Sequence, residues 1–241
     1  MKRFAMSALA LALAATPALT GPALAEDAPS PQTVNAAAPP SAADLLFEQP
    51  QMKNAAPGST ITYDYLRRSG ISKGPFGPPL SDTITFRVEA ANDSKDAAAR
   101  NIRVEMFSGM NRVPAGPFED MPGNPVISLF LENHLRGIAK VLEANPRYLK
   151  NAIRKGLRDK ATVTATKVTV GGREVDAWRV ETKPFEGDAM TERMRGMANM
   201  TYTFVTAPSV PGEIVSIEAQ SKNAEGGELL EEKLSYDQKA G

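Results

Sequence analysis

The chain has 241 residues, no cysteine, and equal numbers of basic and acidic residues, 28 of each. Without cysteine there is no disulfide scaffold, so the fold must depend on an ordinary hydrophobic core, for which this length suffices in a single domain. A net charge near zero argues against a nucleic-acid-binding protein, because such proteins usually carry a strong basic excess.

The first 25 residues have the pattern of a cleavable secretory signal peptide. Lys2 and Arg3 precede an apolar stretch over residues 4–15, and Ala23-Leu24-Ala25 supplies the small-residue pattern before Glu26. The apolar stretch is shorter than the roughly 20 residues needed to span a bilayer. We therefore expect cleavage after Ala25 and no transmembrane segment in the mature chain, which would be exported, periplasmic in the first instance and otherwise secreted.

Residues 26–58 form a lead-in rich in proline and alanine, a composition typical of an extended linker. Within it, Ser41 and Asp44 have the spacing of a capping box, and three apolar residues follow, Leu45, Leu46 and Phe47. Two interpretations stay open: a single helical turn that docks on the folded body, or a transiently helical tail.

Residues 59–237 are predicted to form one β-rich domain. Apolar and polar residues alternate over residues 61–65, 84–90 and 102–106, and again after residue 160, as expected of strands with one face on a core. The Gly171-Gly172 and Gly226-Gly227 pairs indicate turns between such runs. We expect eight or nine strands joined by short loops in an antiparallel sheet.

Two amphipathic helices are predicted between the two groups of strands, over about residues 125–143 and 146–158. Each follows an Asn-Pro pair, at Asn124 and Asn145, which suits an N-cap followed by proline at the first helical position. The helices must bury their apolar faces, and the one-sided sheet is the available partner. The predicted fold is mainly β (α+β), a curved antiparallel sheet with the helical pair packed on its concave face.

His134 is the one histidine of the chain and lies on the apolar face of the first predicted helix. We interpret it first as a core residue with a satisfied hydrogen bond, and second as a polar contact inside a ligand cavity. A hollow interface between sheet and helices would be lined by apolar side chains with a few polar groups. The residues predicted to line it are Phe130, His134, Ile138, Tyr148, Trp178 and Met194.

No catalytic motif is present in the sequence. There is no Gly-x-Ser-x-Gly segment for a nucleophile and no glycine-rich phosphate loop between a strand and a helix. One histidine without cysteine is also a poor supply of zinc ligands. We therefore expect a protein that is not an enzyme and that carries no cofactor.

Four methionines lie close together in the sequence, Met190, Met194, Met197 and Met200. Thioethers are soft ligands that select Cu(I), so a methionine-only copper site is one interpretation, and an oxidant trap is another. The first three have the i, i+4, i+7 spacing of a helical core stripe. We favour this core interpretation, since methionine suits irregular gaps in a core.

The second predicted helix carries a basic patch opposite its apolar face. Such a stripe suits phosphate-bearing head groups or an acidic partner, although a solvated helix face is its ordinary explanation. The patch consists of Arg147, Lys150, Arg154, Lys155 and Arg158.

This order of elements resembles the periplasmic lipoprotein-localisation carriers and their relatives, the Lol-type half-barrels. The resemblance covers about residues 59–237 and rests on element order, so no functional residue is transferred. It implies a hydrophobic cavity between sheet and helices that shields an acyl chain or another apolar ligand. The first expected function is an exported carrier or binding protein for a hydrophobic or amphiphilic envelope ligand. The alternatives are a non-catalytic envelope scaffold or interaction protein with a filled core, and methionine-based Cu(I) binding.

Overall fold

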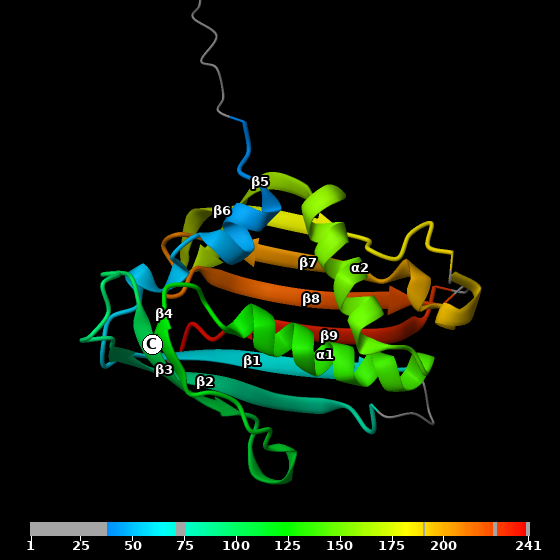
Figure 1. Cartoon of the computed structure of the whole chain (residues 1–241), viewed down its shortest axis with the longest axis horizontal. Helices are drawn as coiled ribbons and strands as arrows, with labels where there is room; N and C mark the ends of the chain where they lie inside the picture. Colours follow the sequence, from blue (N-terminus) through cyan, green and yellow to red (C-terminus); the bar gives the residue numbers. More distant parts are fainter. Residues whose placement is uncertain (1–37, 71–75, 190, 224–225, 240–241) are drawn as a thin grey trace, which may run out of the picture. The chain divides into compact units, whose positions relative to one another are not determined.

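A computed structural model describes residues 38–70, 76–189, 191–223 and 226–239, and the predicted signal peptide lies outside them. The described residues contain a nine-stranded sheet and two α-helices that cover one of its faces (Figure 1). This confirms the predicted fold class. Within the described residues, no helix is long and apolar enough to cross a membrane.

All neighbouring strands of the sheet are antiparallel, in the order β4-β3-β2-β1-β9-β8-β7-β6-β5. The first and last strands of the chain pair with each other and so join the two strand groups into one sheet. The bounds are β1 Thr60–Ser69, β2 Leu80–Ala90, β3 Arg100–Met106, β4 Phe118–Met121, β5 Thr162–Val170, β6 Arg173–Thr182, β7 Thr201–Thr206, β8 Ile214–Lys222 and β9 Glu228–Tyr236.

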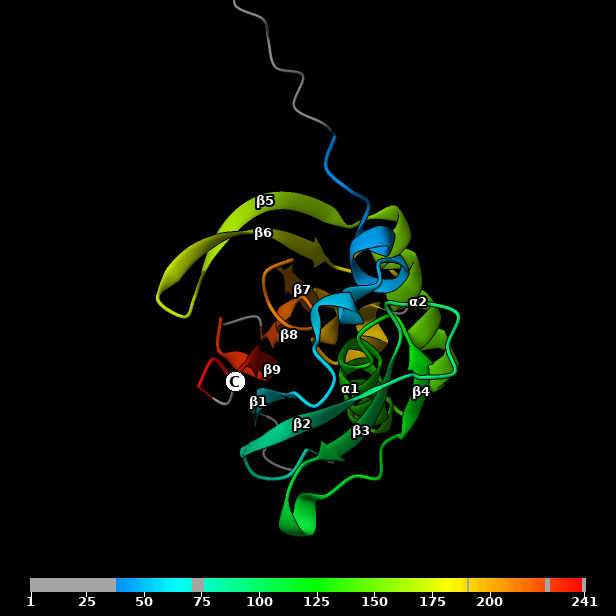
Figure 2. The ribbon, with the colours of Figure 1, turned by 90° about the vertical axis from the view of Figure 1, so that its left-hand side faces the viewer.

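The alternation of apolar and polar residues sets which face of each strand is buried. In β1, Ile61, Tyr63 and Tyr65 are buried, whereas the residues between them are more exposed. Successive side chains of a strand point to opposite faces, so these three share the face that carries the helices. Figure 2 shows the sheet curling so that β5 and β6 arch over toward the helices.

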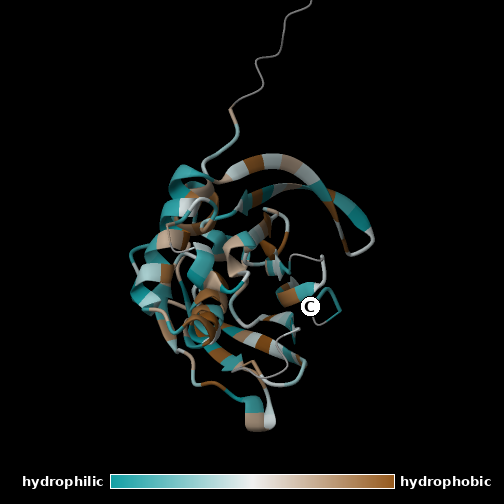
Figure 3. Cartoon of the chain, turned by 90° about the vertical axis from the view of Figure 1, so that its right-hand side faces the viewer, coloured by the Kyte–Doolittle hydropathy of each residue, from teal (hydrophilic) through white to brown (hydrophobic). Residues whose placement is uncertain are grey.

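The two helices are α1, Val126–Leu142, and α2, Pro146–Asp159, and each begins and ends within one residue of its predicted bounds. The predicted N-cap of α2 is confirmed, whereas in α1 the N-cap position is Pro125, one residue after the predicted Asn124. Both asparagine side chains nevertheless accept a backbone hydrogen bond. The Oδ1 atom of Asn124 accepts from the Val126 amide at 3.0 Å, and that of Asn145 accepts from the Arg147 amide at 2.9 Å. Figure 3 shows α1 as a largely hydrophobic helix and α2 as a more hydrophilic one, so α1 is the more deeply packed of the two.

Residues 38–58, part of the predicted lead-in, belong to the same compact unit as the sheet and the helices. Ser41 and Asp44 form the predicted capping box reciprocally: the Asp44 amide donates to Ser41 Oγ at 3.0 Å, and the Ser41 amide donates to Asp44 Oδ2 at 3.3 Å. A single π-helical turn, η1 (Asp44–Glu48), follows, and then a 3-10 turn, η2 (Gln51–Asn54). The turn η1 docks on the body because Leu45 and Leu46 are buried in the core.

Candidate functional site

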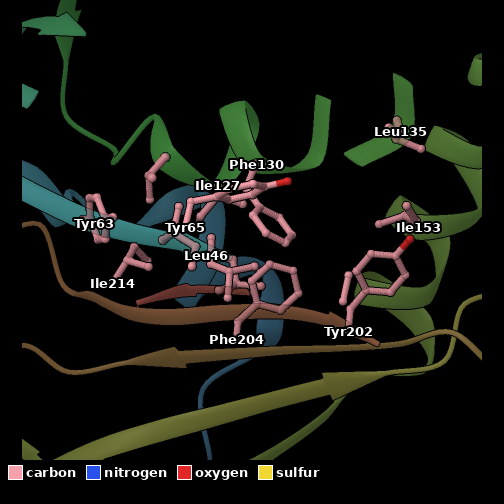
Figure 4. Packing of buried hydrophobic residues seen from close by; sticks show 14 of the residues in the cluster. Leu46, Tyr63, Tyr65, Ile127, Phe130, Leu135, Ile153, Tyr202, Phe204 and Ile214 are labelled. Carbon is pink, nitrogen blue, oxygen red and sulfur yellow. The ribbon is translucent and has the colours of Figure 1, made fainter. Parts of the chain in front are cut away.

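Side chains fill the interface between the sheet and α1. Figure 4 shows Ile127 and Phe130 projecting from α1 toward the side chains of β1 and β7. The rings of Phe130 and Tyr65 lie 6.5 Å apart between centroids, and both residues belong to the same buried cluster as Phe204. At the centre of α1 this interface is therefore a packed core.

A network of buried polar side chains crosses the same interface. His134 Nδ1 lies 3.1 Å from Glu232 Oε1, and His134 Nε2 lies 2.8 Å from the Tyr202 hydroxyl. The Tyr65 hydroxyl donates to Glu232 Oε2 at 2.7 Å, and Asn133 Nδ2 donates to the Tyr65 hydroxyl at 3.3 Å. The network joins α1 to β1, β7 and β9.

The electrostatics of the network favour a charged Glu232 between neutral tyrosines. Burial alone would raise the pKa of Glu232, but the attraction and hydrogen bond of His134, with the hydrogen bond of Tyr65, hold it below its usual value. Burial, reinforced by the Glu232 charge, raises the pKa of Tyr65 and of Tyr202. The carboxylate therefore accepts hydrogen bonds from His134 Nδ1 and from Tyr65, as buried acceptors usually do.

A carboxylate, an imidazole and a hydroxyl in series resemble a proton relay, but this one is sealed from solvent. His134 and Tyr202 are fully buried and Glu232 is 1% exposed, and none of the three lines a groove described below. The first interpretation of His134, a core residue with satisfied nitrogens, matches this position. The arrangement fixes α1 on the sheet.

The six residues predicted to line a cavity do not line one groove together. Phe130, His134 and Ile138 are fully buried in the packed core. Tyr148 and Met194 line a surface groove of about 630 Å³ near the C-terminus of α1. Trp178, on β6, is half-buried at the border of the core.

The predicted basic patch on α2 is divided between two sides of the helix. Lys150, Arg154 and Arg158 follow one another at i, i+4 and i+8 and line a groove against α1 and η1. Lys155 lines a different groove on the other side of α2, which contains Glu186 and Asp188. Arg147 lines none of these grooves.

The groove between α1, α2 and η1, here called the helical groove, is the candidate site. It has a volume of about 450 Å³, within the range of about 300–1,000 Å³ usual for small-molecule sites. Buried apolar side chains of both helices form its floor, and Phe47, 49% exposed, contributes to its wall. Its lining is Ala43, Phe47, Ser128, Leu131, Glu132, Leu135, Lys150, Ile153, Arg154, Leu157 and Arg158.

The larger groove beside Tyr148 is less suited to an apolar ligand, because its lining is rich in charges of both signs. It contains Glu143, Glu192, Arg193 and Arg195. Arg195 is already engaged, since it pairs with Glu143 at 3.1 Å and donates to the Val141 carbonyl at 2.9 Å. Through these contacts Arg195 binds a carbonyl and a carboxylate at the C-terminal end of α1.

The methionine run lies mainly in the core. Met194, Met197 and Met200 are buried, and Met190 lies outside the described residues. The run does not form the single helix that its spacing suggests: two 3-10 turns, η4 (Thr191–Met194) and η5 (Met197–Asn199), are separated by residues with positive φ, Arg195 at 48° and Gly196 at 86°. The burial fits the core interpretation, whereas the continuous helical stripe is wrong. Cu(I) binding stays a prediction.

The sequence patterns did not indicate Glu232 and Tyr202 as the partners of His134, nor Tyr65 as a donor to Glu232. In the sequence, Glu231 and Glu232 form an adjacent pair of acids. In the structure they point to opposite faces of the sheet, and 16% of the Glu231 side chain is exposed but only 2% of the Glu232 side chain. Glu232 points to the buried face of β9, as do Leu230 and Leu234 two positions before and after it. A carboxylate at a core position of a strand is the signal that identifies it.

Comparison with known proteins shows a similarity of structure but none of sequence family. No protein-family model and no curated protein matches the chain. Among solved structures, the chain is similar to the lipoprotein LppX of Mycobacterium tuberculosis, with 10% sequence identity and a TM-score of 0.30, over 74% of this chain and 84% of LppX. The site described above rests on the contacts of this chain itself.

Proposed function

We propose that this chain is an exported, non-catalytic binding or carrier protein for a hydrophobic or amphiphilic ligand, and that the ligand binds in the helical groove. The observation that carries the proposal is the composition of this groove: an apolar floor that includes Leu135, Ile153 and Leu157, with cationic side chains along one edge. Concave sites with mostly apolar linings and a few polar groups are the usual form of small-molecule sites.

The proposal moves the ligand from the sheet–helix interface, where the resemblance to the half-barrel carriers places it, to the outer side of the helices. The packing of Phe130 against Tyr65 supports this move, because a filled interface leaves an apolar ligand no space there. The groove, in contrast, is open to solvent and is flanked by the half-buried Leu131 and the exposed Phe47. A ligand there would cover apolar surface that water now contacts.

The experiment is a displacement titration with a dansylated fatty acid as the fluorescent probe and palmitate as the competitor. Ser128 is exposed on α1 and lines the groove, so Ser128→Trp would occupy the groove without entering the core. We expect this variant to lose probe binding. Asn151→Trp is the matched control, because Asn151 is exposed on α2 but lines the other groove. Equal binding by both variants would reject the helical groove as the site.

The filled core also favours one alternative, a scaffold or interaction protein without a small ligand. Phe130, His134 and Ile138 are all fully buried, as expected of a solid structural domain. The titration separates the two functions: a protein that binds neither the dansylated probe nor palmitate is not a carrier of such ligands.

A further inference from the structure

We propose that the helical groove selects an amphiphile with an anionic head group, and that Arg154 is the residue that binds this head group. This inference rests on the proposed function, because it names the ligand class of the same groove. It follows from how the charged residues of the groove are paired.

The groove has an excess of positive charge. Lys150, Arg154 and Arg158 lie along its α2 edge, and Glu132 of α1 is the one acidic residue in its lining. Three cations facing one anion attract an anionic group, and an apolar floor beside them strengthens the attraction by excluding water.

Two of the three cations already have partners. Lys150 pairs with Glu132 across the groove, and Arg158 pairs with Asp159, with 2.8 Å between Nε and Oδ1. The side chain of Arg154, between them on the helix, makes no hydrogen bond or ion pair within the described ranges and is exposed. Its guanidinium is therefore the cationic group in the lining that is free to bind a ligand.

The chemistry of arginine narrows the head group further. A guanidinium presents a planar set of N–H donors that binds carboxylate or phosphate in a bidentate way, and such charge-assisted bonds are stronger than neutral ones. A tetrahedral or planar oxyanion fits this donor set, whereas a quaternary ammonium group would be repelled by the unpaired charge of Arg154.

The placement of the basic residues favours one bound molecule over a membrane surface. A helix that lies on an anionic membrane presents its cations on one face, but on α2 Arg154 and Lys155 line grooves on different sides of the helix. Lys155 shares its groove with Glu186 and Asp188, and an anionic membrane surface would repel these two carboxylates. The cations beside the helical groove, in contrast, border a concave apolar site.

The test uses three amphiphiles with the same tetradecyl chain, bearing sulfate, phosphocholine or trimethylammonium head groups, below their micelle concentrations. Binding to the full mature chain would be measured by displacement of the dansylated fatty acid. We expect the sulfate to bind about tenfold or more tightly than the trimethylammonium compound, as charge-assisted hydrogen bonds imply. Arg154→Gln should remove most of this difference, leave the phosphocholine affinity within about twofold, and keep the circular dichroism spectrum unchanged.

Lys155→Gln is the matched control, since it removes the same charge from the neighbouring position on the other side of α2, and it should leave all three affinities unchanged. Equal binding of the three amphiphiles, unaffected by Arg154→Gln, would overturn the anionic preference and leave the proposed function standing. Binding of none of them would reject both. Binding only to phosphatidylglycerol vesicles, weakened alike by the two substitutions, would assign the basic residues to a membrane surface and overturn the proposal.

Discussion

His134 on α1 and Glu232 on β9 face each other inside the core, with 3.1 Å between the imidazole Nδ1 and the carboxylate Oε1. The two residues are 98 positions apart in the sequence, so their contact exists only in the folded state. It fixes α1, which forms one side of the helical groove, on the central strands of the sheet.

The first prediction concerns this pair. His134→Leu should lower the free energy of unfolding by about 3–5 kcal/mol, because it leaves the Glu232 charge buried without its partner. Glu232→Leu should also destabilise. The double variant should lose less than the sum of the two single losses, by about 1–3 kcal/mol. Urea denaturation of the four proteins measures this coupling, and strictly additive losses would show that the two side chains do not interact.

The second prediction is a dependence of stability on pH. The pKa of Glu232 is lowered in the folded state, so its contribution is fully present above the pKa of an unfolded glutamate, about 4.3. That contribution is lost as the pH falls through the lower folded value. The free energy of unfolding should therefore decrease below about pH 4.3, and the decrease should be smaller in Glu232→Gln.

Glu231→Gln is the control for this pH series. It changes the adjacent residue on the same strand, whose side chain points to the other face of the sheet. It should follow the wild-type curve. If Glu232→Gln retains the full acid sensitivity of the wild type, the low-pH loss belongs to other carboxylates.

The third prediction concerns the segment before β1. Leu46→Ala should cost about 2–5 kcal/mol, since Leu46 is 2% exposed and its truncation leaves a cavity in the core. Phe47→Ala, one position on, should cost less than about 1 kcal/mol because Phe47 is 49% exposed. Thermal unfolding of the two variants compares them. Similar losses would mean that η1 does not dock as described.

The fourth prediction reverses the usual effect of replacing a helical glycine. Gly→Ala ordinarily gains up to about 1 kcal/mol in a helix interior. At Gly156, however, an added Cβ would lie 2.8 Å from Pro184 Cβ and 3.0 Å from Thr182 Oγ1. The overpacking should cost about 1–3 kcal/mol, which exceeds the gain.

Asn151→Ala is the comparison for Gly156→Ala. Asn151 is exposed on the same helix, and alanine has the higher helix propensity, so this variant should be neutral or slightly stabilised in chemical denaturation. A Gly156→Ala protein as stable as Asn151→Ala would mean that α2 does not pack so closely on the segment after β6.

The strands and helices could be predicted because their signals are local. The alternation at Ile61, Tyr63 and Tyr65 is a property of neighbouring residues, and so is the Asn145-Pro146 start of α2. Local signals failed in the methionine run, where the positive φ values at Arg195 and Gly196 interrupt a helical spacing. Nothing in the spacing of the methionines encodes that interruption.

The helical groove could not be predicted, because it depends on where a segment distant in sequence docks. Its wall contains Phe47, which is placed there by the burial of Leu45 and Leu46 in the core. The division of the basic residues follows from the same packing. Arg154 and Lys155 are neighbours in the sequence, and only the contacts of α2 with α1 and η1 place them in different grooves.

Photocrosslinking tests the location of the ligand most directly. Wild-type protein would be irradiated with a fatty acid that carries a diazirine in its chain, and the adducts would be mapped by mass spectrometry. We expect adducts on residues of the helical groove, at Ala43, Phe47, Leu131 and Ile153. Adducts concentrated instead on Phe130, Ile138 and Trp178 would place the ligand between the sheet and the helices and would reject the helical groove as the binding site.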